Sequence, residues 1–258
     1  MSDRLHELAS LPVSAGGTLR GDLYSTAGKA AESAMLFVHG FGSLRRGEKA
    51  SAFEEACARR GWMFAAFDFR GHGESTGTLL DLRCRALMED LDAIAAYLQG
   101  RGVRHIFPVG SSMGGWAVAW MALRHPDRIP ACVLLAPAFH FPQGIWHRLN
   151  ERQQRAWKET GRFRLKNDWI DADVAYALIA EAFSLDELLR GWKKPLLIFH
   201  GMNDETVPFE HTIRVVERLP ATVPVEVRLL NDGDHRLVAH KHEIAEAACA
   251  HFARFGVK

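Results

Sequence analysis

The chain has 258 residues, 48% of them hydrophobic and 24% charged, and a formal net charge of +1 at pH 7. This composition is ordinary for a globular protein and suits one large domain. The near-neutral charge argues against a nucleic-acid partner, because phosphate binding usually leaves a basic excess, and no apolar run approaches the roughly 20 residues that cross a bilayer.

Targeting and redox signals favour a cytoplasmic protein. Residues 1–11 carry Asp3 and Glu7 and no long apolar core, so they do not resemble a signal peptide. The cysteines lack C-x-x-C spacing, which argues against a disulfide framework or a zinc site. We therefore expect a cytoplasmic protein with no metal, no cofactor and no membrane or nucleic-acid partner. The four cysteines are Cys57, Cys84, Cys132 and Cys249.

Strand and helix patterns alternate along the chain. The predicted strands are 18–25, a weakly alternating segment expected at an antiparallel edge, and 34–38, 62–69, 105–109, 131–136, 195–201 and 225–230. The predicted helices are 49–60, 82–98, 116–123 and about 239–255. Runs that are apolar throughout are typical of strands buried on both faces. The sequence therefore predicts an α/β fold, with a mostly parallel central sheet flanked by helices.

One segment, 139–194, is far longer than an ordinary crossover between strands. It is rich in charge and in aromatic residues and predicts two to four short helices. We expect it to form a helical cap or lid over a core made of 1–138 and 195–258; an ordinary structural excursion that touches no ligand is the alternative. Its aromatic residues include Trp146, Trp157, Phe163, Trp169, Phe183 and Trp192.

The sequence Gly110-Ser111-Ser112-Met113-Gly114 has the G-x-S-x-G pattern, between a predicted strand and a predicted helix. This context is typical of a nucleophile elbow, a sharp turn that exposes a serine hydroxyl. Ser112 is the expected nucleophile, because it alone has glycines two positions before and after it. Ser111 is the competing serine. A serine in place of aspartate disfavours dehalogenase and epoxide-hydrolase chemistry.

A serine nucleophile needs a base and a carboxylate that orients the base. Ligands of open parallel sheets bind at the carboxyl ends of the strands, where Asp204 and His235 follow the two last predicted strands. The order Ser, Asp, His is that of the α/β-hydrolase triad. The alternatives for the base are His39, His72 and His200; those for the acid are Glu205, Asp232 and Asp234, of which the two last are better suited to shaping the turn around His235.

Acyl transfer also requires hydrogen-bond donors for the developing oxyanion. The amide of Met113 follows the nucleophile at the start of a helix. The loop His39-Gly40-Phe41-Gly42 follows the strand 34–38, and we expect its Phe41 amide to be the second donor. The Phe41 ring can also line an acyl pocket.

Five motifs together resemble the α/β-hydrolase superfamily: H-G-F-G at 39–42, D-F-R-G-H-G-E-S at 68–75, G-S-S-M-G-G at 110–115, H-G-x-x-D-x-x-V-P at 200–208 and D-H at 234–235. They are similar to a subfamily of acyl-protein thioesterases and acyl-glucuronide esterases, some of them mitochondrial. The resemblance implies Ser112, Asp204 and His235 as a triad acting on a small carboxylic ester or thioester. A C–C bond hydrolase, a cofactor-free perhydrolase and a ligand-binding receptor remain as alternatives.

Overall fold

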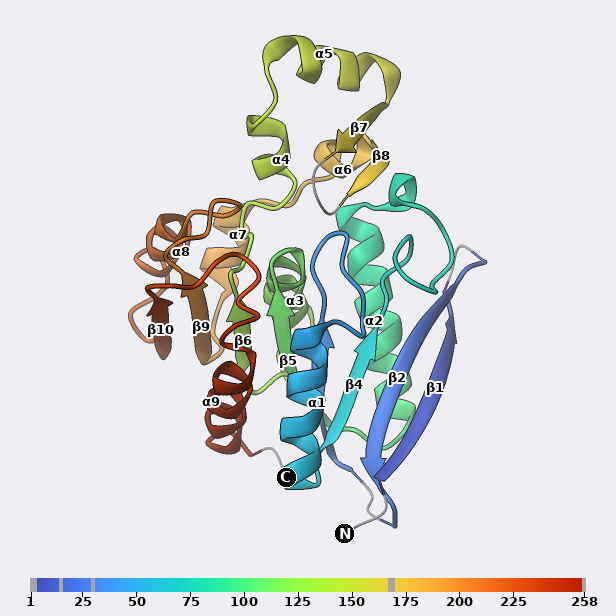
Figure 1. Cartoon of the computed structure of the whole chain (residues 1–258), viewed down its shortest axis with the longest axis vertical. Coiled ribbons are helices and arrows are strands. Elements are labelled where there is room, and N and C mark those ends of the chain that lie inside the picture. The colour runs from blue at the N-terminus through green and yellow to red at the C-terminus, as the bar shows by residue number, and fades with distance from the viewer. Residues whose placement is uncertain (1–3, 14–15, 29–30, 167–169, 257–258) are drawn as a thin grey trace.

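A mixed sheet runs through the middle of the computed structural model, with helices on both of its faces (Figure 1). The model describes residues 4–13, 16–28, 31–166 and 170–256. The strand order is β1-β2-β4-β3-β5-β6-β9-β10. The pairs β1–β2 and β2–β4 are antiparallel, and the other neighbours are parallel. The mostly parallel α/β sheet predicted from the sequence is confirmed.

The elements of the sheet and its flanking helices agree with most predicted bounds to within a few residues. The strands are β1 (Arg4–Pro12), β2 (Thr18–Thr26), β3 (Ser33–Val38), β4 (Met63–Phe67), β5 (His105–Ser111), β6 (Cys132–Leu135), β9 (Leu196–Gly201) and β10 (Val225–Leu230). The helices are α1 (Glu48–Arg60), α2 (Cys84–Gly100), α3 (Met113–Arg124), α8 (Phe209–Val216) and α9 (Lys241–Ala253), with a 3-10 turn at Leu79–Asp81.

Strand β3 shows why the central strands are apolar throughout. Met35 and Phe37 pack in one core cluster with α1 and α9, whereas Leu36 and Val38 pack in the other cluster with α2 and α3. Every residue of β3 is buried. Alternate side chains thus enter different cores, which is why both faces of the strand are apolar from Ala34 to Val38.

The amino-terminal edge of the sheet differs from the prediction. Strand β2 was expected at the edge, but it lies between β1 and β4, and β1 is the outer strand. Most side chains of β1 are exposed, and only Ala9 and Leu11 of this strand are buried. Because an edge strand buries so little, its apolar pattern is too weak to be recognised from the sequence.

Most of the described part of the segment 139–194 lies beyond the carboxyl ends of the parallel strands, whereas its last helix, 185–191, lies beside α3 (Figure 1). It contains helices as predicted, but also an antiparallel strand pair, β7–β8, that the sequence did not lead us to expect. Trp169 of the predicted cap lies outside the described residues. The elements of the segment are α4 (Gln143–His147), α5 (Glu151–Thr160), β7 (Arg162–Lys166), β8 (Asp171–Ala175), α6 (Ala177–Ala180) and α7 (Leu185–Gly191).

This insertion has a small aromatic core of its own. The fully buried Trp157 packs against the rings of Trp146, Phe163 and Tyr176. Its indole N–H donates to the carbonyl of Val174 in β8, at 3.1 Å. Helix α5 is therefore fixed to the β7–β8 pair by both ring packing and a buried hydrogen bond.

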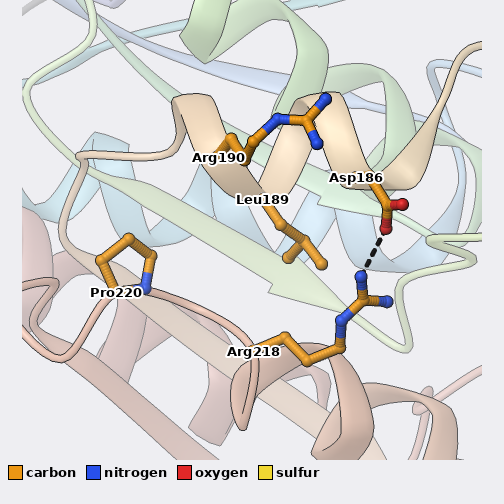
Figure 2. Close-up of a pocket in the computed structure, with 5 residues that line it drawn as sticks. All are labelled: Asp186, Leu189, Arg190, Arg218 and Pro220. Atoms are coloured by element: carbon orange, nitrogen blue, oxygen red, sulfur yellow. Dashed lines mark hydrogen bonds and ion pairs between the residues drawn. The ribbon is translucent and has the colours of Figure 1, made fainter.

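Contacts near its carboxyl end fasten the insertion to the core. The ring of Phe183 lies 5.6 Å from that of Trp116 and 4.9 Å from that of Trp120, both on α3. Figure 2 shows Asp186 of α7 directed toward Arg218, which follows α8, and the two side chains form an ion pair. No helix among the described residues is long and apolar enough to cross a membrane.

Candidate active site

Ser112 occupies a strained turn between β5 and α3. Its φ of 55° and ψ of −117° are unusual for a residue with a side chain. A Cβ on Gly110 would lie 2.3 Å from the carbonyl oxygen of Gly114, and a Cβ on Gly114 would lie 2.2 Å from that of Val38. Only glycine fits at these two positions, so the G-x-S-x-G spacing is what lets the chain turn so sharply.

Hydrogen bonds join the three residues predicted as the triad. Oγ of Ser112 lies 2.9 Å from Nε2 of His235, and Nδ1 of His235 lies 2.7 Å from Oδ2 of Asp204. The carboxylate only accepts hydrogen bonds, so the proton of the neutral imidazole is on Nδ1. Nε2 is then free to accept the hydroxyl proton of Ser112, which is the geometry of an activated serine.

Asp204 is fixed from several sides. Its Oδ1 accepts hydrogen bonds from the amides of Thr206 and Val207, at 2.9 and 2.7 Å. Burial raises the pKa of this carboxyl, but the hydrogen bonds from His200 and His235 outweigh burial and hold the pKa well below its usual range. Asp204 is therefore an anion throughout the physiological pH range.

His200 contacts the carboxylate of Asp204, a contact that the sequence analysis did not predict. Its Nε2 lies 3.1 Å from Oδ2 of Asp204 and 2.9 Å from the carbonyl of Val207, and its Nδ1 lies 2.8 Å from Oγ1 of Thr212. Since both partners of Nε2 are acceptors, Nε2 carries the proton and Nδ1 accepts from Thr212. His200 thus supports the carboxylate. The H-G-x-x-D spacing is the sequence signal of this contact.

The two amides predicted as oxyanion donors lie at the ends of β3 and β5. Met113 is the first residue of α3, and Phe41 follows β3 in the loop beside the elbow. A Cβ on Gly40 would lie 3.2 Å from Cβ of Ser112, so this loop approaches the nucleophile closely. Within the described residues, the N–H groups of Phe41 and Met113 have no hydrogen-bond acceptor.

His39 and His72, the alternatives for the base, instead fix the loop that carries Phe41. His39 donates from Nδ1 to the carbonyl of Gly40 and accepts at Nε2 from the Phe69 amide, at 2.8 and 3.0 Å. Nε2 of His72 accepts from the Gly42 amide at 3.2 Å. Burial lowers the pKa of His39 to about 4 and that of His72 to about 3, so both rings are neutral at pH 7.

The other competing residues have different partners. Oγ of Ser111 lies 2.8 Å from Nζ of Lys49. Oδ1 of Asp234 accepts from the Leu237 amide at 2.8 Å, which is the turn-shaping role expected for this residue. Asp232 lies 2.9 Å from the imidazole of His240, and Glu205 is exposed at the cavity described next.

A cavity of about 910 Å³ lies over Ser112 and His235. This volume is in the usual range for small-molecule sites. The insertion forms much of its apolar wall, and Phe41 contributes from the core. The ring of Phe141 lies 5.8 Å from that of Phe41 and 6.1 Å from that of Trp116. The apolar lining residues of the insertion are Phe139, Phe141, Ile145, Leu149, Leu165 and Ile170.

Comparisons with known proteins agree with this architecture. The rat palmitoyl-protein thioesterase ABHD10, named as mitochondrial, is 30% identical over 213 residues, which cover 79% of this chain and 69% of the rat protein. The structure of the mouse α/β-hydrolase domain-containing protein 10 has a TM-score of 0.78 at 25% identity and covers 97% of this chain and all of that one. Est1E of Butyrivibrio proteoclasticus, solved with ferulic acid, has a TM-score of 0.82 at 20% identity, with 96% and 98% covered.

The family model described as serine aminopeptidase, S33, matches residues 29–168, which is more than half of the chain. The sequence relatives and the fold neighbours carry the names thioesterase, esterase and hydrolase. The resemblance to the α/β-hydrolases and the expected enzyme class are therefore confirmed. The chain belongs to the serine aminopeptidase S33 family of α/β-hydrolases and is a hydrolase of the carboxylesterase or thioesterase type.

Proposed function

We propose that this enzyme hydrolyses carboxylic esters or thioesters through an acyl-enzyme on Ser112, with His235 as general base and Asp204 as the residue that orients it. The observation that carries the proposal is the continuous line of hydrogen bonds, 2.9 and 2.7 Å long, from a serine in the cavity to a carboxylate anion. The partners of His235 suit these roles, because Nδ1 faces the carboxylate of Asp204 and Nε2 faces the hydroxyl of Ser112.

The reaction proceeds in two halves. Oγ of Ser112 attacks the acyl carbon while Nε2 of His235 takes its proton, and the amides of Phe41 and Met113 bind the oxyanion of the tetrahedral intermediate. The intermediate collapses, and the proton on Nε2 passes to the leaving oxygen or sulfur. A water molecule, deprotonated by the same nitrogen, then attacks the acyl-enzyme and returns Ser112 to its starting state.

Electrostatic preorganisation supports this sequence of steps. The imidazolium that forms on His235 faces the anion of Asp204, which His200 and two backbone amides already hold in place. The neutral rings of His39 and His72 fix the loop of Phe41 without placing a further charge beside the oxyanion. These groups therefore need to move little when charge develops in the transition state.

The acyl chain fits the apolar wall that the insertion contributes. Leu165 of β7 and Ile145 of α4 extend the apolar surface that begins at Phe41. The name of the rat relative specifies a palmitoyl-protein thioesterase, which favours thioesters among the proposed substrates. The insertion acts in this proposal as the cap that selects the acyl group. The cytoplasmic location remains a prediction, because the mouse and rat relatives are named as mitochondrial.

The decisive experiment compares the wild type with Ser112→Ala on p-nitrophenyl butyrate and on a butyryl thioester. We expect kcat to fall by about 10⁴-fold or more, as when the nucleophile of other serine hydrolases is removed. Ser10→Ala, at an exposed position on β1, is the matched control and should keep its activity. A fluorophosphonate should label the peptide that contains Ser112 at that residue. Labelling of Ser111, or near wild-type turnover by Ser112→Ala, would contradict the proposal.

A further inference from the structure

A lysine stands in the same cavity as the proposed nucleophile. Lys49, in the first turn of α1, lines the cavity together with Ser112 and His235. Its Nζ donates to Oγ of Ser111, the residue that directly precedes Ser112, at 2.8 Å. The ammonium group is thereby held close to the place where the scissile bond must lie.

This ammonium has no counter-charge in the described part of the chain. No carboxylate there lies within ion-pair distance of Lys49, and the carboxylates of Glu48, its neighbour in the chain, and of Asp204 and Asp234, which act on it electrostatically, have other partners. Glu48 pairs with Lys241 at 2.7 Å, Asp204 accepts from His235, and Asp234 accepts from the Leu237 amide. Among the residues that the structure describes, Ser111 is the only hydrogen-bond partner of the three donors on Nζ.

Lys49 is half-buried, and an anion beside it would stabilise its charge. Burial lowers the pKa of Lys49 to about 8 and the cation of Arg236 acts in the same direction, whereas Asp234 and Asp204 oppose them. Most of the lysine is therefore still charged at pH 7. Buried charges in folded proteins are normally paired, and an unused ammonium donor in a cavity is a natural partner for a carboxylate or a phosphate.

The rest of the cavity lining strengthens this argument. The charged groups that line it are the cations Lys49, Arg148, Arg214 and Arg236 and the carboxylates Glu48 and Glu205. Lys241 already neutralises Glu48 from outside the lining. A cationic excess in a site with apolar walls concentrates anionic ligands.

We propose that Lys49 binds an anionic group of the substrate, a carboxylate or phosphate a few bonds from the scissile carbonyl, so that the preferred substrates are acidic esters or thioesters. This inference rests on the proposed function and narrows it to a substrate class. Lys49 then contributes to substrate binding, and its hydrogen bond to Ser111 positions the ammonium group before the substrate binds.

Two matched substrate pairs test this inference. One pair carries the charge on the leaving group, 4-acetoxyphenylacetate against its methyl ester; the other carries it on the acyl group, 1-naphthyl hydrogen glutarate against 1-naphthyl pentanoate. The wild type should prefer the acidic member of at least one pair by about tenfold in kcat/KM, the size expected for one charge-assisted hydrogen bond. The pair that shows the preference tells which side of the scissile bond faces Lys49.

Variants of Lys49 test whether this lysine causes the preference for acidic substrates. Lys49→Met should lower the acidic-to-neutral ratio about tenfold, and Lys49→Arg should keep most of it. Lys158→Met, which removes the same charge at an exposed position of α5, should leave the ratio unchanged. Inhibition of neutral-ester hydrolysis by 4-hydroxyphenylacetate, compared with its methyl ester, needs no variant and should show the same preference for the anion.

The outcomes separate the two proposals. If Ser112→Ala hydrolyses the neutral esters as fast as the wild type, the proposed nucleophile is wrong. If the wild type hydrolyses neutral esters through Ser112 but shows no acidic preference in either pair and no stronger inhibition by the anion, the role of Lys49 is wrong. An acidic preference that survives in Lys49→Met also overturns it.

Discussion

His200 in β9 lies beside Asp204 in the loop that follows this strand, with Nε2 of His200 3.1 Å from Oδ2 of Asp204. Both side chains are fully buried. This contact supports the proposed triad, since Asp204 in turn contacts His235. The histidine is a positioning residue that acts through the carboxylate.

Replacement of His200 by alanine should lower kcat by about 10- to 100-fold, because it removes a buried hydrogen bond to a charged group. KM should change little, since His200 does not line the cavity. His200→Gln, which keeps a donor, should recover part of the loss. Steady-state kinetics on p-nitrophenyl butyrate measure both effects; a rise in KM without a fall in kcat would contradict the positioning role.

Gly110→Ala should destabilise the fold by about 3 kcal/mol or more, because the new Cβ would lie 2.3 Å from a backbone oxygen that cannot move aside. Gly144→Ala is the matched control, since a Cβ there meets nothing within 4 Å. Urea unfolding at pH 7 gives the two free energies of unfolding. Equal stability of the two variants would show that the elbow relaxes more easily than its packing indicates.

Stability should fall as the pH drops from about 6.5 to 4. Burial lowers the pKa of His251 to about 4, with a contribution from Arg254, and burial likewise lowers the pKa of His39 to about 4. In this pH range the unfolded chain binds protons at these residues and the folded chain does not, so acid favours unfolding. Each histidine contributes up to about 1.4 kcal/mol per pH unit.

His251→Phe isolates one of these contributions. Neither ring nitrogen of His251 has a hydrogen-bond partner among the described residues, and the ring already packs against Phe255. The variant should therefore lose less stability than the wild type between pH 6.5 and 4.5, as measured by urea unfolding. An unchanged pH slope would show that His251 is protonated in the folded state.

Trp157→Ala should loosen the insertion and leave the core sheet folded, because Trp157 packs within the insertion and donates to Val174 there. We expect kcat/KM for p-nitrophenyl octanoate to fall about tenfold or more, with a smaller loss for the acetate, whose acyl group does not reach the apolar wall. Trp157→Phe, which keeps a ring, should have a kcat/KM for the octanoate between those of the wild type and Trp157→Ala. Equal losses for both esters would argue against the insertion as the selector of the acyl group.

The sequence predicted the parallel strands well because both of their faces are buried. Met35 and Leu36 enter different cores, and such continuous apolar runs are easy to recognise. The β7–β8 pair escaped prediction because its strands are short and half-exposed, and Phe163 and Leu165 alternate too briefly to separate a strand from a loop.

The proposed triad could be located because each member follows a strand whose end was predicted. The residues that support the proposed site, His200 and Lys49, could not be located from the sequence in this way. His200 lies within a strand, and its contact with Asp204 depends on how the loop after β9 folds back. Lys49 lies on a helix whose sequence pattern predicts only an amphipathic surface. The sequence around Lys49 does not indicate that its ammonium group reaches Ser111, because the two residues are far apart in the chain.

The ring of Phe141 packs against both Phe41, whose amide is a proposed oxyanion donor, and Trp116 on α3, the helix that follows Ser112. The insertion therefore packs against the loop that carries the proposed oxyanion donor. Grafting the insertion of a related enzyme onto this core would change the acyl selectivity. It would also change the side chains that pack against the loop of Phe41. We therefore expect substitutions of Phe141 that alter the acyl selectivity to alter turnover as well.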